Sequence, residues 1–224
     1  MIGEDYEKTY TSVARLESVR LVCTIVVARK LTLWQVDFVS AFLNSNSNYE
    51  VYMEQLRGFK EREGDYVWKL KKTLYGTMQD AHDWAMNLNK IFEGHGYYRS
   101  KADLQIKSRT IGDELTIIST WTDNVLGVSS ILEGEKKAKN ELQSSYEIKD
   151  SGDIKLILGI KINRNPNLGD IRFFQQAYAQ YMLIRFNMSK CASASTLLSA
   201  ELVLSNEDSL NSTKKITEMS NVPY

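Results

Sequence analysis

The segment at residues 115–130, LTIISTWTDNVLGVSS, constrains the fold more than any other part of this chain. β-Branched residues stand on both sides of an Asp-Asn pair, and this pattern predicts two strands joined by a tight turn at residues 121–124. Asp and Asn tolerate the left-handed backbone that a two-residue hairpin needs. Asp123 is therefore expected at a rigid, exposed tip, where its carboxylate is free to bind a metal ion.

A second aspartate lies upstream, near the end of another predicted strand. This strand covers residues 31–38 and contains Asp37 in the run LWQVDF. A helix at 80–92 is expected before the hairpin, and a helix at 131–146 and a strand at 154–162 after it. This order favours a split βαβ arrangement, in which helices cover one face of an antiparallel sheet. In such a sheet the two aspartates could share a site, because the first strand ends beside the tip of the central hairpin.

Periodicity and turn residues predict the remaining elements. The sequence contains no internal repeat and no low-complexity segment. The expected elements are a helix that starts from a cap at Thr11 or Ser12 and runs to about Arg29, short strands at 50–53 and 66–71, a strand at 104–109, a returning strand at 171–175, a helix at 177–186, and a loosely ordered polar tail from residue 199 onward.

The composition narrows the classes of function. The 28 Lys and Arg residues balance the 28 Asp and Glu residues, so the overall charge gives no support to a nucleic-acid-binding protein, which usually carries a basic excess. The 2 cysteines and 2 histidines have no metal-ligand spacing, which argues against a zinc site. No apolar run reaches membrane-spanning length and no signal-peptide pattern follows Met1, so we expect no membrane partner and an intracellular setting.

Short motifs occur along the chain in a fixed order. They are GEDY at 3–6, VARLESVR at 13–20, QVD at 35–37 with AFLN at 41–44, EVYMEQ at 50–55 with GF at 58–59, WKLKKTLYG at 68–76 with Gln79 and Trp84, LGI at 158–160, RFNM at 185–188 and VPY at 222–224. Each motif alone is weakly specific, but their order and spacing together are highly specific. In this combination the sequence resembles the reverse transcriptase domain of copia-type long-terminal-repeat retrotransposons, a part of the Pol polyprotein, over nearly the whole chain.

The resemblance implies an α+β fold. Its centre is expected to be a polymerase palm, a ferredoxin-like split βαβ sheet with helices on one face, joined to partial fingers and a partial thumb or connection. The reverse transcriptase domain is expected over residues 1–190, and residues 191–224 form a polar C-terminal tail that starts the connection toward RNase H. The chain is expected to be a truncated slice of a longer polyprotein, with integrase upstream and RNase H downstream.

The resemblance also implies the chemistry of an RNA-directed DNA polymerase, a nucleotidyltransferase. Two Mg²⁺ ions held by three aspartates would activate the primer 3′-hydroxyl and stabilise the leaving pyrophosphate. By resemblance, Asp37 is the first catalytic and metal-binding aspartate and Asp123 is the second. Asn124 stands where the third belongs, because the family's usual tip is YVDD. An amide removes a full negative charge there, so a weakened metal site and a rate loss of roughly 10²–10³ or more are expected.

Other positions carry implied roles beside simpler structural ones. Phe42 resembles the aromatic steric gate that rejects a ribose 2′-hydroxyl, although it is also a good core aromatic. Gln79 resembles a residue that lines the incoming-nucleotide site, although a polar residue is common at a helix start. Leu158, Gly159 and Lys161 fall where the primer-gripping strand is expected, and an ordinary sheet strand explains them equally well.

The segment after the LYG motif departs from the family pattern in charge. Met78 and His82 replace a Lys and an Arg, while Asp80 and Asp83 add acidity. Surfaces that face phosphates need cations, so this helix start is expected to hold template or nucleotide less well.

Three functions remain open from the sequence. The first is a reverse transcriptase domain that binds an RNA or DNA primer–template and deoxynucleotides, inside the cell in a cytoplasmic particle or the nucleus. The second is a non-enzymatic, transposon-derived remnant. The third is a co-opted nucleic-acid-binding protein, and the neutral overall charge argues against it.

Overall fold

The computed structural model describes residues 13–61, 64–77, 79–195, 205, 209 and 212–220 of the chain. The chain divides into two compact units, and each is described by itself. One unit holds residues 1–155 and 162–172, and the other holds residues 156–161 and 173–224. Asp37, Asp123 and Asn124 all belong to the first unit.

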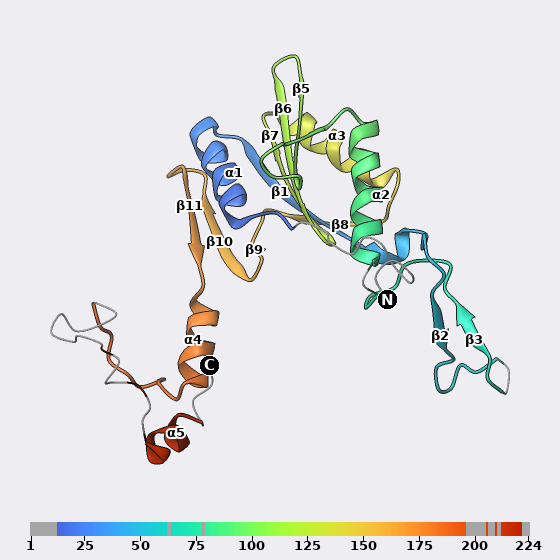
Figure 1. Cartoon of the computed structure of the whole chain (residues 1–224). Coiled ribbons are helices and arrows are strands. Elements are labelled where there is room, and N and C mark those ends of the chain that lie inside the picture. The colour runs from blue at the N-terminus through green and yellow to red at the C-terminus, as the bar shows by residue number, and fades with distance from the viewer. Residues whose placement is uncertain are drawn as a thin grey trace. The chain divides into compact units, whose positions relative to one another are not determined.

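An antiparallel sheet of six strands forms the centre of the first unit (Figure 1). Its strand order is β4-β5-β6-β7-β1-β8, and every neighbouring pair runs antiparallel. The prediction of a mixed α and β fold with antiparallel sheets is confirmed, and β6 and β7 are the predicted hairpin. The strands are β1 (Thr32–Phe38), β4 (Tyr98–Arg99), β5 (Ile106–Ile111), β6 (Glu114–Trp121), β7 (Asn124–Ser129) and β8 (Ile148–Gly152).

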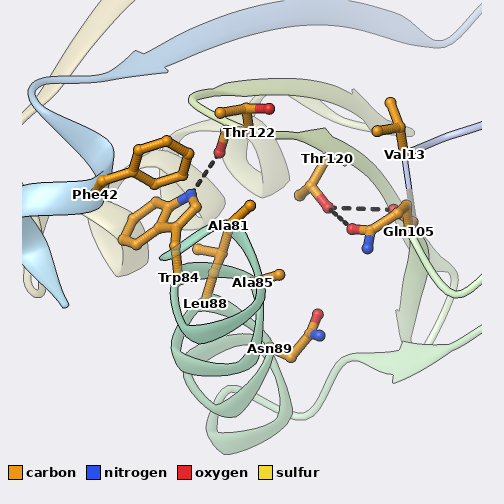
Figure 2. A pocket seen from close by; sticks show the side chains of 10 residues that line it. All are labelled: Val13, Phe42, Ala81, Trp84, Ala85, Leu88, Asn89, Gln105, Thr120 and Thr122. Atoms are coloured by element: carbon orange, nitrogen blue, oxygen red, sulfur yellow. Dashed lines mark hydrogen bonds between the residues drawn. The ribbon is translucent and has the colours of Figure 1, made fainter. Parts of the chain in front are cut away.

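Helices α2 (Asp80–Gly94) and α3 (Leu132–Gln143) share one buried apolar cluster with the sheet. Alternate residues of β1 enter this cluster because alternate side chains of a strand point to the same face. Trp84 and Leu88 enter it from the same side of α2 (Figure 2). The cluster consists of Trp34, Val36, Phe38, Ala41, Phe42, Trp84, Leu88, Phe92, Tyr97, Ile118, Val125, Ala138 and Leu142.

The contact between Trp34 and Gly127 fixes how β1 pairs with β7. The two residues are direct cross-strand partners, and a Cβ atom on Gly127 would overlap three carbons of the Trp34 ring. Only glycine leaves room for the indole at this position, since its backbone can be approached closely. The indole N–H donates to the Ser129 hydroxyl at 3.3 Å, which ties the ring to the same strand.

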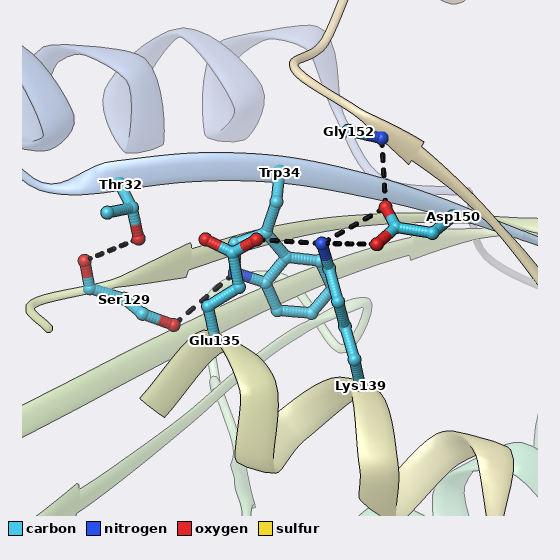
Figure 3. Close-up of polar contacts among 7 residues, drawn as sticks. All are labelled: Thr32, Trp34, Ser129, Glu135, Lys139, Asp150 and Gly152. Carbon is cyan, nitrogen blue, oxygen red and sulfur yellow. Dashed lines mark hydrogen bonds and ion pairs between the residues drawn. The ribbon is translucent and has the colours of Figure 1, made fainter. Parts of the chain in front are cut away.

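Lys139 of α3 lies over the Trp34 ring (Figure 3). Its ammonium nitrogen is 5.5 Å from the ring centroid and donates to Glu135 at 2.7 Å and to Asp150 of β8 at 2.8 Å. The bond to Asp150 joins α3 to β8 across the indole and holds the helix over the sheet. In the same view, α1 (Leu16–Arg29) lies on the opposite side of β1.

Shorter elements complete the described part of the chain. Within the described residues, none of the helices combines the length and the apolar character needed to cross a membrane. The elements are the 3₁₀-helix η1 (Ala41–Asn44), a two-stranded sheet of β2 (Tyr52–Glu54) and β3 (Val67–Lys69), a three-stranded sheet in the order β11-β10-β9, formed by β9 (Leu156–Ile157), β10 (Ile160–Asn165) and β11 (Asp170–Phe174), and the helices α4 (Gln176–Arg185) and α5 (Thr213–Met219).

The single strand predicted at 154–162 is wrong, because a tight turn interrupts it. Leu158 and Gly159 have φ angles of 48° and 76°, and they turn β9 back onto β10. Two successive positive φ angles are typical of a two-residue hairpin turn, and glycine adopts one of them without steric cost. The apolar alternation across the turn made two short strands resemble one long one.

The predictions for the start of the first helix and for the C-terminal tail also differ from the structure. Helix α1 begins at Leu16, after Arg15 in extended conformation. Thr11 and Ser12, the predicted caps, lie outside the described residues. The segment predicted to be a loosely ordered tail contains α5, so that prediction is wrong for residues 213–219.

A buried lysine lies beneath α2. Lys107 of β5 is 1% exposed, its ammonium nitrogen donates to the Thr120 hydroxyl at 2.8 Å, and it lies 5.3 Å from the centroid of the Phe92 ring. Burial lowers the pKa of Lys107 to about 7 from the ordinary 10.5. The fold therefore contains an amine that loses its charge near neutral pH.

The glycine requirement at position 127 predicts a specific loss of stability. Gly127→Ala should lower the free energy of unfolding by about 2 kcal/mol or more, because overpacking a core costs roughly 1–3 kcal/mol. Gly134→Ala in α3 is the matched control, since its added Cβ would meet the movable end of the Glu114 side chain and alanine favours a helix. Urea unfolding followed by circular dichroism measures both changes, and equal losses would contradict the role given to Gly127.

The lowered pKa of Lys107 predicts how the unfolding free energy of the chain depends on pH. Its pKa is lower in the folded chain than in the unfolded chain, so the unfolded chain binds more protons between about pH 7 and pH 10.5, and stability rises with pH across that window. The difference in unfolding free energy across this window is on the order of 5 kcal/mol. Lys107→Met should raise the unfolding free energy at pH 7 and flatten this rise in urea titrations at several pH values. Lys90→Met, at an exposed lysine of α2, should leave the slope unchanged, and an unchanged slope in Lys107→Met would refute the assignment.

Candidate active site

The β6–β7 tip is a two-residue loop with a strained backbone. Thr122 and Asp123 form the loop, and the residues on either side of it, Trp121 and Asn124, are cross-strand partners. Thr122 has a φ of 46°, a left-handed conformation that β-branched residues rarely adopt. The sequence assigns this conformation to Asp123 and Asn124, and that assignment is wrong, because neither has a positive φ. Such strain persists only where the surroundings fix the backbone.

The end of β1 lies directly beside this tip. Asp37 is the cross-strand partner of Asn124, and the backbone N–H of Phe38 donates to the Asp123 carbonyl at 2.7 Å. The structure thus brings together Asp37, Asp123 and Asn124, the three residues that the sequence singles out for one site. Their catalytic and metal-binding roles stay predictions.

Asn124 takes part in a chain of side-chain hydrogen bonds across the tip. Gln35 Nε2 donates to Asn124 Oδ1 at 2.9 Å, and Asn124 Nδ2 donates to Asp123 Oδ1 at 2.8 Å. Gln35 reaches the tip because it lies on the same face of β1 as Asp37, two residues away. Both ends of the Asn124 amide are therefore engaged by the protein itself. We call these three bonded residues, Gln35, Asn124 and Asp123, the amide relay.

The charges around the tip act on two further groups. Burial raises the pKa of Asp37, the charge of Asp123 raises it further, and Lys149, the cross-strand partner of Asp37 on β8, lowers it. Burial raises the pKa of Tyr75, as do the charges of Asp123 and Asp37. The Tyr75 phenol therefore keeps its proton at neutral pH and can donate a hydrogen bond near the two carboxylates.

Phe42, which the sequence predicts to contact nucleotide, lies in η1 next to Tyr75. Their ring centroids are 4.3 Å apart. Phe42 also lines a cavity of about 90 Å³ beside the tip (Figure 2). Other side chains that line it come from α2, β6, the β6–β7 loop and the segments before α1 and β5. They are Val13, Ala81, Trp84, Ala85, Leu88, Asn89, Gln105, Thr120 and Thr122.

Gln79, the other residue predicted to contact nucleotide, directly precedes α2 and is buried. The two acids that follow it are buried as well. Asp80 accepts the backbone N–H of Leu74 at 2.8 Å, and Asp83 accepts the backbone N–H of Asn48 at 3.4 Å. The sequence predicts these acids as added charge on a phosphate-facing surface, and the structure corrects this, because they anchor neighbouring loops from the interior.

Leu158, Gly159 and Lys161, the predicted primer-grip residues, lie in the β9–β10 hairpin. Leu158 and Gly159 form its turn, and Lys161 pairs with Leu156. The side chains of Leu158 and Lys161 are exposed. These residues belong to the second unit, and their role in holding a primer stays a prediction.

The residues at the tip do not fit a centre for two Mg²⁺ ions. Such a centre would need three carboxylates, and the described residues contain no group of three or more His, Cys, Asp or Glu side chains that could hold a metal ion. Asn124 adds no charge, and its carbonyl oxygen already accepts a hydrogen bond from Gln35. Its N–H group points at a carboxylate oxygen of Asp123 that a cation would otherwise use.

Sequence reasoning does not identify four residues that act on this tip. Gln35 carries a usable signal, because its spacing of two from Asp37 places both on one strand face. Trp84 donates its indole N–H to the Thr122 carbonyl, Lys149 acts on Asp37 through its charge, and Tyr75 lies where the charges of Asp123 and Asp37 raise its own pKa. No local sequence pattern predicts the roles of these three residues, because each role depends on elements that meet only in the folded chain.

Comparisons with known proteins agree with the motif series. A family model described as "Reverse transcriptase (RNA-dependent DNA polymerase)" matches residues 1–200. The retrovirus-related Pol polyprotein from transposon TNT 1-94 of Nicotiana tabacum is 29% identical over 224 residues, which cover 99% of this chain and 17% of that protein. The corresponding polyprotein from transposon RE2 of Arabidopsis thaliana is 28% identical over 187 residues, which cover 83% of this chain and 13% of that protein.

A shorter relative matches as well. The putative transposon Ty5-1 protein of Saccharomyces cerevisiae is 31% identical over 144 residues, which cover 64% of this chain and 46% of that protein. The chain therefore spans less than half the length of this relative, and 17% and 13% of the two plant Pol polyproteins.

The amide relay predicts how a cation acts on stability. Asn124→Asp should make the melting temperature depend on Mn²⁺, because a carboxylate beside Asp123 and opposite Asp37 adds repulsion that a bound cation relieves. Thermal melts in Mn²⁺ and in EDTA should differ by roughly 2–4 °C or more for this variant. They should coincide for the unaltered chain and for Asn124→Ala, which loses the amide without gaining charge. Equal stabilisation of all three proteins by Mn²⁺ would contradict the relay.

Proposed function

The chain belongs to the reverse transcriptase family of copia-type retrotransposons, and we propose that its six-stranded sheet is a polymerase palm. The connectivity supports this proposal. Along the chain, β1 is followed by α2, the β6–β7 hairpin, α3 and β8, and the order in the sheet is β6-β7-β1-β8. A strand, helix, hairpin, helix and strand in this order make a split βαβ unit. In this proposal residues 1–190 form the reverse transcriptase domain, β2 and β3 are part of the fingers, and the second unit begins the thumb.

The proposed activity is RNA-directed DNA synthesis at the β6–β7 tip, and this chain performs it poorly. The observation that carries this conclusion is the bond from Asn124 Nδ2 to the Asp123 carboxylate. A neutral donor there replaces a charge that the reaction needs, since charge stabilisation is the main contribution to phosphoryl transfer. We expect the chain to bind primer–template and to have lost most of its nucleotidyl transfer.

Nucleic-acid binding is supported by the surface near β3. Lys69, Lys71 and Lys72 are exposed there, although Lys69 forms an ion pair with Glu50. Lysines that neutralise phosphates supply most of the affinity of sequence-independent binding, and that affinity falls as salt rises. In this proposal the surface contacts the template strand.

The remaining predicted site residues take their roles from the same proposal. Phe42 would exclude a ribose 2′-hydroxyl, and its position against Tyr75, beside the two aspartates, supports that role. Gln79 would line the incoming-nucleotide site. Leu158, Gly159 and Lys161 would hold the primer, as the turn and first residues of an exposed hairpin.

The likeness to Pol polyproteins suggests further partners. The proposed partners are an integrase segment upstream and an RNase H segment downstream in a longer polyprotein. The proposed location is intracellular, in a cytoplasmic particle or in the nucleus.

Primer extension tests the proposed function. A primed RNA template is incubated with deoxynucleotides in Mg²⁺ or Mn²⁺, and extension by the unaltered chain is compared with extension by Asn124→Asp. Restoring the carboxylate should raise the rate by roughly 10²–10³. Asp37→Asn, added to Asn124→Asp, is the matched control and should return the rate to background. Robust extension by the unaltered chain would refute the impairment.

The amide relay also favours a second candidate, a protein that binds nucleic acid without any polymerase activity, because the relay satisfies the tip without a cation. Absence of extension by Asn124→Asp, with salt-dependent binding of primer–template retained, would select this candidate. Absence of binding to labelled primer–template at low salt would reject both candidates.

A further inference from the structure

Two hydrogen bonds from outside the hairpin hold the strained tip. The indole N–H of Trp84, on α2, donates to the Thr122 carbonyl, and the backbone N–H of Phe38, on β1, donates to the Asp123 carbonyl at 2.7 Å. Both loop residues therefore have their carbonyl oxygens bound by other elements. A non-glycine residue at positive φ costs on the order of 1–3 kcal/mol and needs such external support.

The Trp84 ring is itself immobilised. It is 1% exposed, and its ring centroid lies 5.1 Å from that of Phe38 and 5.1 Å from that of Tyr146, both in edge-on contacts. Phe38 directly follows Asp37 in β1. The indole is thus fixed against the same strand end that carries the first candidate aspartate.

Close packing alone does not hold the tip on this side. Trp84 and Thr122 both line the cavity of about 90 Å³, so part of the space behind the loop contains no protein atoms (Figure 2). A directional bond can fix a loop where packing is incomplete. A buried indole N–H left unpaired would cost about 1–3 kcal/mol, which favours keeping the bond to the Thr122 carbonyl.

We propose that Trp84 is a positioning residue of the candidate catalytic centre. Its indole N–H fixes the backbone of Thr122 and so sets where the Asp123 carboxylate stands relative to Asp37. Trp84 acts through these residues and contacts no substrate. The inference rests on the proposed function where it concerns cation binding, but the geometry of the tip can be tested without it.

Hydrogen exchange in the unaltered chain and in Trp84→Phe tests the geometry. Phenylalanine keeps an aromatic ring against Phe38 and removes the N–H donor together with part of the volume of the indole. The exchange rate of the Phe38 amide, measured by NMR relative to the Ile118 amide in the middle of β6, should rise at least about tenfold. Tyr97→Phe is the control, because it also removes a buried aromatic donor, one that bonds Glu141 away from the tip, and the ratio should stay unchanged. Equal ratios in the two variants would overturn the proposal.

Mn²⁺ affinity tests the consequence for the centre. In the Asn124→Asp background, electron paramagnetic resonance should show that Trp84→Phe weakens Mn²⁺ binding by at least about tenfold, at temperatures where the protein stays folded, and that Tyr97→Phe does not. An unchanged affinity in Trp84→Phe would overturn the positioning role. If Asn124→Asp binds Mn²⁺ no better than the unaltered chain, the proposed function fails at that point, and the exchange experiment alone decides the role of Trp84.

Discussion

The close approach of the Trp34 indole to the backbone of Gly127 is the constraint on which the rest of the fold depends. It allows one register between β1 and β7, and that register places Asp37 opposite Asn124. A slip by one residue would turn every side chain of β1 to the other face of the sheet, so Asp37 would point into the cluster beneath α2 and α3. The candidate site therefore depends on a glycine and a tryptophan that take no part in its chemistry.

In this fold the polar groups of the tip form hydrogen bonds with one another and with neighbouring strands, and they need no cation for this. Three carboxylates at this position would repel one another, whereas the amide relay joins its side chains by hydrogen bonds. Donors from α2 and β1 hold the backbone of the loop. The Asn124 amide is thus part of a hydrogen-bonded tip. An amide at position 124 is compatible with this architecture, because the sheet and the helices over it are held by other residues.

Much of this architecture is predictable from local pattern. Alternating apolar residues predict the β6–β7 hairpin, and the order of helices and strands predicts that Asp37 and Asp123 meet. The sequence does not predict the left-handed Thr122, because β-branched residues disfavour that conformation and only tertiary bonds enforce it. It does not predict the turn at Leu158 either, since the apolar alternation continues through it.

Buried polar groups are the second kind of feature that the sequence does not predict. Asp80 and Lys107 are residue types that usually lie at the surface, yet both are buried. Asp80 accepts a backbone hydrogen bond from Leu74, and Lys107 donates to Thr120 beneath α2. The orientation of the Asn124 side-chain amide cannot be predicted from the sequence either, because it depends on a hydrogen bond from Gln35 in another strand. Each of these cases is decided by a partner far away along the chain.

Anomalous diffraction from crystals soaked in Mn²⁺ tests the central claim most directly, because it locates the cations themselves. The account predicts that the unaltered chain shows no pair of Mn²⁺ peaks between Asp37 and Asp123, and that Asn124→Asp shows such a pair. A pair of well-occupied Mn²⁺ sites at the tip of the unaltered chain would contradict the account.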